Sequence, residues 1–90
     1  MFPRIKSVIY RQEYRLALTF TNGETGEINL RDRIINRGGV FRALEEMAFF
    51  QQVQVDPESG TLVWPNGVDL DPDVLYSKTM NIPLPTLAEA

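Results

Sequence analysis

The chain has 90 residues, of which 43% are hydrophobic, and it carries a net charge of −3 with neither cysteine nor histidine. This length supports one domain with a single modest core, and the lack of cysteine excludes a disulfide framework and thiolate chemistry. No stretch has the apolar length of a signal peptide or of a membrane span, so we expect a cytoplasmic protein that does not contact a membrane.

The first residues predict a β-strand. Over residues 3–10, Ile5 and Ile9 share one face, and Val8 and Tyr10 share the other. Such an alternation, although imperfect here, is typical of a strand whose two faces have different surroundings.

Residues 14–30 show the clearest alternation in the chain and predict a β-hairpin. Three large apolar residues share one face of its first strand: Leu16, Leu18 and Phe20. Asn22-Gly23 then provides the positive φ angles that a tight hairpin turn requires. The alternation resumes with Ile28 and Leu30 facing inward, and Gly26 is a candidate β-bulge.

The middle of the chain predicts helical structure. Residues 30–35 can form one short helical turn, which Gly38-Gly39 ends. Apolar residues then recur at helical spacing and predict a central helix over residues 41–46. Phe49 and Phe50 follow, and we expect them to cover the core as the chain turns into the next strand.

Residues 53–76, VQVDPESGTLVWPNGVDLDPDVLY, hold the densest signal. Val53 and Val55 alternate with polar residues, and residues 61–64 form a second β-rich run. The DPESG segment between them reads as a chain reversal, because proline fixes φ and glycine accepts positive φ. We therefore predict a second hairpin, with Trp64 packed in the core at its end.

A C-terminal helix is predicted to begin after Asp71. This carboxylate can accept a free amide of the first turn, Pro72 suits the first helical position, and Asp73 favours the positive end of the helix dipole. From Met80 onward two prolines leave no usable period. We expect one domain over residues 1–79, followed by an extended or disordered tail over 80–90.

These elements predict an α+β fold. Its sheet is small, antiparallel or mixed, and is built from two β-hairpins plus the N-terminal strand. A central helix and a short C-terminal helix complete it.

Several motifs resemble those of a bacterial family. They are the N-terminal PRIKSV, the hairpin YRLALTFTNGE, a strand ending VQVD, and the segment GTLVWPNGVDLDPDVLY. Over about residues 3–76 the chain is similar to the family known as domain of unknown function 2442. The resemblance implies a compact α+β fold without an assigned reaction, and genomic company with small proteins of toxin–antitoxin type. Some relatives carry an appended helix-turn-helix domain, which we do not expect in this chain.

Charge is unevenly distributed along the sequence. Up to Leu44 there are eight cations and four anions, whereas from Glu45 onward one cation faces eight anions. The simpler interpretation is that folding places basic strands beside acidic turns. The alternative is a polarised surface that binds a partner.

The sequence does not indicate an enzyme. Without histidine or cysteine, the usual activated nucleophile and its base are absent, and only a carboxylate site would remain. Asp69, Asp71 and Asp73 have the spacing of calcium ligands, but an EF-hand loop would need glycine in place of Val74 and glutamate in place of Met80. Capping of a helix explains these aspartates better, so we expect no catalytic residue, metal or cofactor.

The candidate interaction residues are four arginines and three residues of the WPNGVD segment: Arg31, Arg33, Arg37, Arg42, Trp64, Asn66 and Asp69. The arginines can form a small basic patch, while Asn66 and Asp69 also fit turn and cap positions. We predict a non-catalytic interaction or regulatory module, antitoxin-like or an accessory subunit, that forms a homodimer or binds a small protein. One alternative is a component of a DNA-binding regulator, which the isoelectric point near 4.8 disfavours, and a third is a carboxylate-based metalloenzyme. No small-molecule substrate is indicated.

Overall fold

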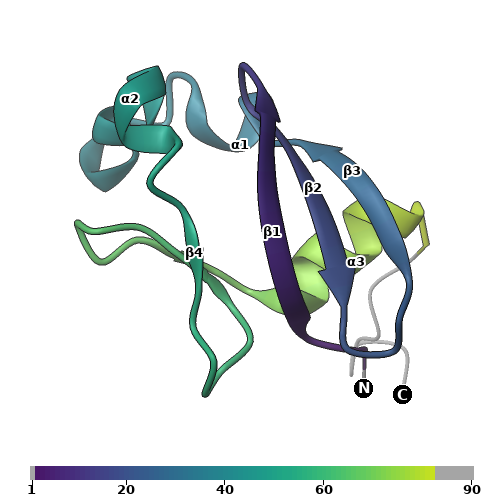
Figure 1. The fold of residues 1–90 in the computed structure, drawn as a ribbon. Helices are drawn as coiled ribbons and strands as arrows, with labels where there is room; N and C mark the ends of the chain where they lie inside the picture. Colours follow the sequence, from purple (N-terminus) through teal and green to yellow (C-terminus); the bar gives the residue numbers. More distant parts are fainter. Residues whose placement is uncertain (1, 83–90) are drawn as a thin grey trace, which may run out of the picture.

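The computed structural model describes residues 2–82, whose strands form two three-stranded antiparallel sheets joined by short helices (Figure 1). The elements in chain order are β1 (Ile5–Gln12), β2 (Arg15–Phe20), β3 (Thr25–Asn29), α1 (Arg31–Ile34), the 3₁₀-helix η1 (Gly39–Glu45), α2 (Met47–Phe50), β4 (Gln54–Val55), β5 (Leu62–Val63), β6 (Asp69–Leu70) and α3 (Pro72–Met80). This architecture confirms the predicted α+β class and divides the strands between sheet A, in the order β1-β2-β3, and sheet B, in the order β4-β5-β6.

The hairpin of β2 and β3 forms as predicted. The three apolar residues of β2 that were expected to share a face are all buried. At the turn, the Phe20 N–H donates to the Glu24 carbonyl at 2.8 Å, and Gly23 has a φ of 90°, which an L-residue rarely adopts. The Asn22-Gly23 sequence therefore sets the register of the two strands.

The face assignment predicted for the first strand is wrong. Ile5 is buried, but Ile9 is 60% exposed, whereas Val8 and Tyr10 pack against the core. The pairing of β1 with β2 shifts between Ile5 and Ser7, so β1 has an extra residue at that point. Such a bulge exchanges the two faces of the strand beyond it, which no local alternation reveals.

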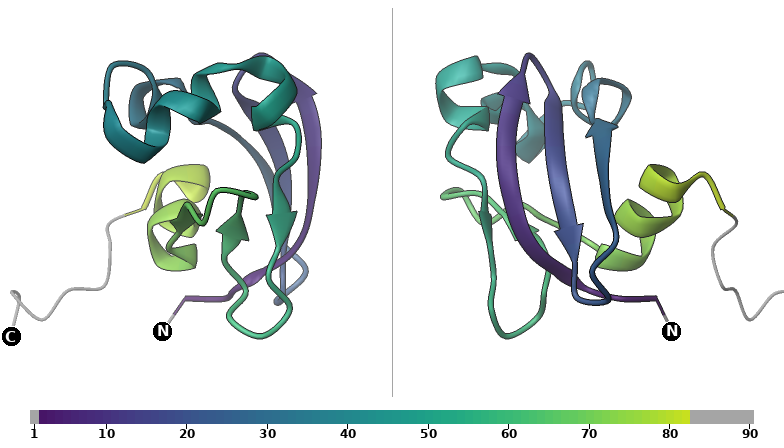
Figure 2. Two further views of the ribbon diagram at one scale, coloured as in Figure 1. Left: turned by 90° about the vertical axis from the view of Figure 1, so that its left-hand side faces the viewer. Right: turned by 45° about the vertical axis from the view of Figure 1, so that its right-hand side comes forward.

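Gly26 is not a bulge, because it pairs regularly with Leu18 in the ladder between β2 and β3. Its lack of a side chain matters for packing instead. A Cβ atom at this position would lie 2.5 Å from the Cγ2 atom of Thr79 in α3. The glycine thus lets α3 approach the inner face of β3 (Figure 2).

The helical turn expected at residues 30–35 is present as α1, but the central α-helix predicted over 41–46 does not form: residues 41–45 belong to the 3₁₀-helix η1, and Glu46 lies outside it. The residue at the N-cap position is Gly38, which has a φ of 72° and no side chain to accept a free N–H of the first turn. The start of a longer α-helix is therefore not stabilised here. After an extended residue, Glu46, the chain forms the separate helix α2. Phe50 belongs to this helix and is fully buried in the core, where its ring meets that of Tyr14 edge-on at 5.3 Å.

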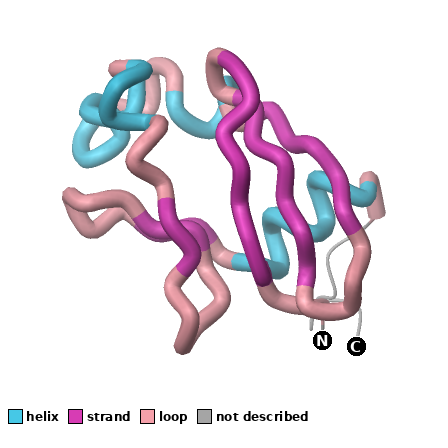
Figure 3. Tube along the Cα trace, in the orientation of Figure 1, coloured by secondary structure: helices cyan, strands magenta, loops and turns pink. Residues whose placement is uncertain are grey.

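The predicted second hairpin is confirmed by β4 and β5. Its turn is closed by hydrogen bonds from the Asp56 N–H to the Thr61 carbonyl at 2.9 Å and from the Gly60 N–H to the Asp56 carbonyl at 2.7 Å. The sequence did not reveal β6, which adds to β5 after the Pro65-Asn66-Gly67 turn. All three strands have two residues and are joined by comparatively long loops (Figure 3).

Helix α3 starts as predicted. The Asp73 N–H donates to the Asp71 Oδ1 atom at 2.8 Å, and Pro72 occupies the first turn. Leu75 and Tyr76 are buried against the sheets. Met80 is the last residue of α3 rather than part of a tail, and the remainder of the expected tail, from residue 83, lies outside the described residues.

The core lies between sheet A on one side and α3 with sheet B on the other, while α1, η1 and α2 gather at one end (Figures 1 and 2). Aromatic rings connect these parts. The ring of Phe20 in β2 packs edge-on against that of Tyr76 in α3, with 4.8 Å between the ring centroids. The ring centroids of Phe50 in α2 and of Trp64, which lies beside sheet B, are 5.8 Å apart. Among residues 2–82, every helix is too short or too polar to cross a membrane.

Candidate interaction surfaces

β3 is an edge strand, since sheet A continues only on its β2 side. The Phe20 N–H bonds the Glu24 carbonyl at one end of the hairpin, and the Leu30 N–H bonds the Tyr14 carbonyl at the other. Because bonded pairs alternate in an antiparallel ladder, Gly26 and Ile28 bond to β2. Three peptide groups therefore point away from the sheet, without a backbone partner among residues 2–82: those of Thr25, Glu27 and Asn29.

The opposite edge of sheet A is protected. β1 contains two register shifts, between Ile5 and Ser7 and between Tyr10 and Gln12, which interrupt a regular row of outward peptide groups. β4 lies beside β1, and the Ile5 N–H donates to the Gly60 carbonyl at 3.0 Å. Bulges and a covering segment are the usual means by which edge strands avoid pairing with other chains. β3 has neither a bulge nor a proline.

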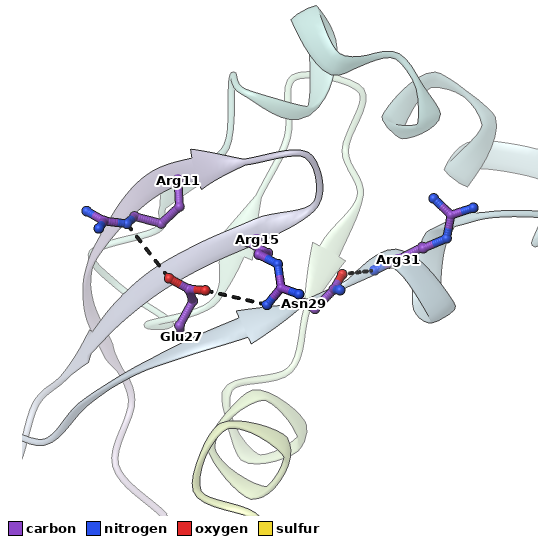
Figure 4. A network of polar contacts seen from close by, with 5 residues as sticks. All are labelled: Arg11, Arg15, Glu27, Asn29 and Arg31. Carbon is purple, nitrogen blue, oxygen red and sulfur yellow. Dashed lines mark hydrogen bonds and ion pairs between the residues drawn. The ribbon is translucent and has the colours of Figure 1, made fainter.

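One charge lies on β3, and it is compensated. Glu27 contacts two arginines on the face of sheet A that points away from α3, as Figure 4 shows. Its Oε2 atom lies 3.8 Å from the Arg11 Nε atom, and its Oε1 atom lies 3.5 Å from the Arg15 Nη1 atom. All three side chains are about half exposed, so each pair contributes less than about 1 kcal/mol to stability. The two guanidinium groups therefore offset the negative charge of Glu27 on this strand.

The predicted basic patch is brought together only in part. Arg33 and Arg37 line a cavity of about 230 Å³ together with Phe41 of η1 and Leu70 of β6. Arg31 is the first residue of α1 and lies next to the end of β3, where its backbone N–H donates to the Asn29 Oδ1 atom at 3.0 Å (Figure 4). Arg42 is exposed and does not line the cavity.

The three candidate residues of the WPNGVD segment have structural contacts. Trp64 is 3% exposed, and its indole N–H donates to the Phe50 carbonyl at 3.0 Å, which confirms its place in the core. Asn66 holds the β5–β6 turn, because its Oδ1 atom accepts the Val68 N–H and its amide donates to the Val40 carbonyl. Asp69 is exposed in β6 and shares a shallow cavity with Arg4 of the N-terminal half.

The distribution of charge is partly interleaved. Arg4 comes from the basic half and lines the cavity that holds three aspartates of the acidic half: Asp69, Asp71 and Asp73. The Arg4 guanidinium also donates to the Ser59 carbonyl at 2.8 Å. Within residues 2–82, these aspartates and the other acidic side chains form no group of three that could hold a metal ion.

Sequence reasoning did not identify the open edge of β3 as a candidate site. From its sequence, TGEIN, this segment is predicted only to be part of the second strand of a hairpin. A usable signal exists, since neither proline nor lysine occurs in it, whereas the first strand contains Lys6 and Arg11. That signal becomes informative only when the strand order is known.

Comparison with known proteins gives one match. A family model described as "Protein of unknown function (DUF2442)" matches residues 5–80. Neither the search of curated proteins nor that of solved structures finds a match. The matched range includes every element from β1 to α3, and no catalytic family is indicated.

Proposed function

The chain belongs to the DUF2442 family, and we propose that it is a non-catalytic interaction module that pairs with a second copy of itself through β3. The open edge of β3 carries this proposal. It offers outward peptide groups at three alternate residues of a regular strand, which is the arrangement used when a strand is added to an existing sheet. Because the β1 edge is protected, the β3 side of sheet A is the one left free for such pairing by the elements within residues 2–82.

The strand TGEIN is compatible with its own copy. In a two-fold antiparallel arrangement centred on Glu27, Thr25 of one chain lies opposite Asn29 of the other, and both residues can form hydrogen bonds. The two Glu27 side chains face each other, but each already lies beside Arg11 and Arg15. Four guanidinium groups thus surround two carboxylates, so like-charge repulsion between the copies is offset.

The end of α3 supports an added strand. In both views α3 continues past β3 (Figures 1 and 2). Met80, its last residue, packs against the core, and Ile82 just beyond it is 39% exposed. Inward-facing side chains of an added strand would cover this apolar surface, which favours pairing at β3 through burial as well as hydrogen bonding.

Amide hydrogen exchange at two protein concentrations tests the proposal with an internal control. The amides of Thr25, Glu27 and Asn29 should exchange quickly in dilute protein and become protected as the concentration rises. The amides of Gly26 and Ile28 bond to β2 in either state, so their exchange should not change. Sedimentation should show a mass increase to that of a dimer over the same range.

A proline variant adds a second test. Thr25→Pro removes an N–H that bonds no other described residue, so the free energy of unfolding should change by less than about 1 kcal/mol. The dissociation constant of the dimer should rise about tenfold or more. A protein that stays monomeric at tens of micromolar, with fast exchange at all three edge amides, would refute self-pairing. Protection of these amides only with a second small protein would instead support the accessory or antitoxin-like role over the homodimer.

A further inference from the structure

We propose that the cavity between α1, η1 and β6 binds an acidic side chain of a protein partner. Arg33 is half-buried at one wall and Arg37 is exposed at the rim, while Phe41 and Leu70 provide an apolar lining. This surface is separate from β3, so the inference does not depend on strand pairing. Its failure would leave the proposed function untouched.

The two guanidinium groups have no carboxylate partner among residues 2–82. Both ion pairs among these residues are made by Glu27 of β3, and they involve Arg11 and Arg15 rather than Arg33 or Arg37. The Arg37 Nε atom donates to the backbone carbonyl of Asp32 at 3.2 Å, which leaves the terminal nitrogens of Arg37 available. The nearby Glu45 carboxylate accepts the Asn36 N–H rather than an arginine.

The loop that connects the two arginines is fixed. Asn36 adopts a φ of 63°, and its N–H bonds Glu45, while the Arg37 N–H donates to the Ile34 carbonyl at 3.3 Å. Together with the bond from Arg37 to the Asp32 carbonyl, these contacts position the Arg37 guanidinium at the cavity that Arg33 also lines. A site whose donors are positioned in advance loses less conformational entropy when it binds.

Size and lining define the class of ligand. A cavity of about 230 Å³ is smaller than sites for cofactors or drug-sized molecules, but it can accept one side chain. Arginine presents paired N–H donors that match a carboxylate, and Phe41 and Leu70 can contact the methylene groups behind it. A nucleic acid fits less well, because the chain carries a net charge of −3 and would repel a polyanion outside this small cavity.

Titration with two short peptides tests the inference. The probe is an acetylated and amidated peptide of sequence LEEL, and its matched control is LQQL. In a ¹H–¹⁵N spectrum of the full chain, LEEL should shift the signals of Arg33, Arg37 and Leu70 at about millimolar concentration, and LQQL should not.

Variants locate the binding. Arg37→Gln should weaken LEEL binding about tenfold, the usual effect of losing one hydrogen bond to a charged group. Arg42→Gln removes an exposed arginine outside the cavity and should leave binding unchanged. Arg33 is half-buried, so its replacement can also affect folding. LEEL binding is therefore compared between Arg33→Gln and Arg33→Lys, and the thermal unfolding of both variants is measured as a check on folding.

Four outcomes would overturn the inference. Equal shifts with both peptides would show apolar contact alone, and equal weakening by Arg42→Gln would show diffuse attraction. The absence of any shift at about 10 mM LEEL, about ten times a millimolar Kd, would show that the cavity does not bind carboxylates. Tighter binding of a short DNA duplex than of LEEL at the same signals would assign the cavity to nucleic acid.

Discussion

One exposed carboxylate, Glu24, connects the first hairpin to the C-terminal helix. The Tyr76 hydroxyl donates to the Glu24 Oε1 atom, and the Asn22 side-chain amide donates to the same atom at 2.6 Å. These hydrogen bonds, that of Tyr76 first, lower the pKa of Glu24, and the bond to Glu24 raises the pKa of Tyr76. The contact therefore depends on pH at both ends of the scale.

The sign of each dependence follows from its shift. Because the pKa of Glu24 is lowered by folding, its stabilising effect is complete above the ordinary value of 4.5 and is lost as pH falls through the lowered value. Because the pKa of Tyr76 is raised, its effect is complete below the ordinary value of 10.0 and is lost as pH rises through the raised value. The contact contributes fully between these limits.

We expect Tyr76→Phe to lower the melting temperature at about pH 7 and to have a smaller effect as the pH falls below 4.5 and through the lowered pKa of Glu24, where the carboxylate becomes protonated. The phenylalanine ring retains the packing against Phe20, so the comparison isolates the hydroxyl. Thermal unfolding followed by circular dichroism measures the difference. A Tyr76→Phe effect that is independent of pH would show that the hydroxyl acts through another contact.

Gly26 provides a second test at the residue scale. In the native chain, Gly26→Ala places a Cβ atom 2.5 Å from the Thr79 methyl group, and we expect it to cost about 1–3 kcal/mol. In a Thr79→Ala background that methyl group is absent, and the same substitution should become neutral or slightly stabilising, since alanine restricts the unfolded chain. A double-mutant cycle by urea unfolding measures this coupling. Additive effects would contradict the proposed contact.

At the scale of the element, α3 depends on its first turn. Asp71→Ala removes the acceptor of the Asp73 N–H and should lower stability by about 1 kcal/mol. Asp69→Ala is the matched control, because Asp69 is exposed and precedes the helix. Millimolar calcium should not raise the melting temperature of the native chain, and a rise of several degrees that a chelator reverses would favour a metal site over a cap.

The two edge strands of sheet A differ in whether another chain could pair with them. β1 has two bulges, two cations and β4 beside it, whereas β3 has one compensated charge. Pairing of another chain at β1 would require β4 to move and the bulges to straighten. At β3 no described element has to move.

At the scale of the whole molecule, we expect no binding of duplex DNA at about 0.15 M salt. The net charge is −3, and Glu27 compensates two of the arginines on the open face of sheet A. A mobility-shift assay with protein at up to about 10 µM tests this expectation. A retarded band that weakens when Arg31, Arg33 and Arg37 are replaced would instead support the DNA-binding alternative.

Local signals predicted the parts of the fold that depend on neighbouring residues. The alternation of β2, the Asn22-Gly23 turn and the Asp71 cap are all patterns of residues within a few positions of one another. Strand β6 was missed because its two residues, Asp69–Leu70, are too few for an alternating pattern. The bulge in β1 was missed because it arises from pairing with Phe20, fifteen positions away from Ile5.

The candidate surfaces were harder to predict than the fold, for the same reason. Arg33 and Arg37 were chosen for their charge, but their cavity also requires Leu70, which β6 brings from a distant part of the chain. Trp64 and Asn66 were chosen for their side chains, yet both are engaged in internal hydrogen bonds. The openness of β3 depends on strand order, and composition alone does not determine strand order.

The order of elements along the chain has a consequence for synthesis. Sheet A is complete by residue 29, while α3, which covers its inner face, begins at residue 72. During translation at roughly 5–20 residues per second, β1, β2 and β3 leave the ribosome several seconds before α3. In that interval the apolar face of β2 and the free edge of β3 are exposed together on a nascent chain.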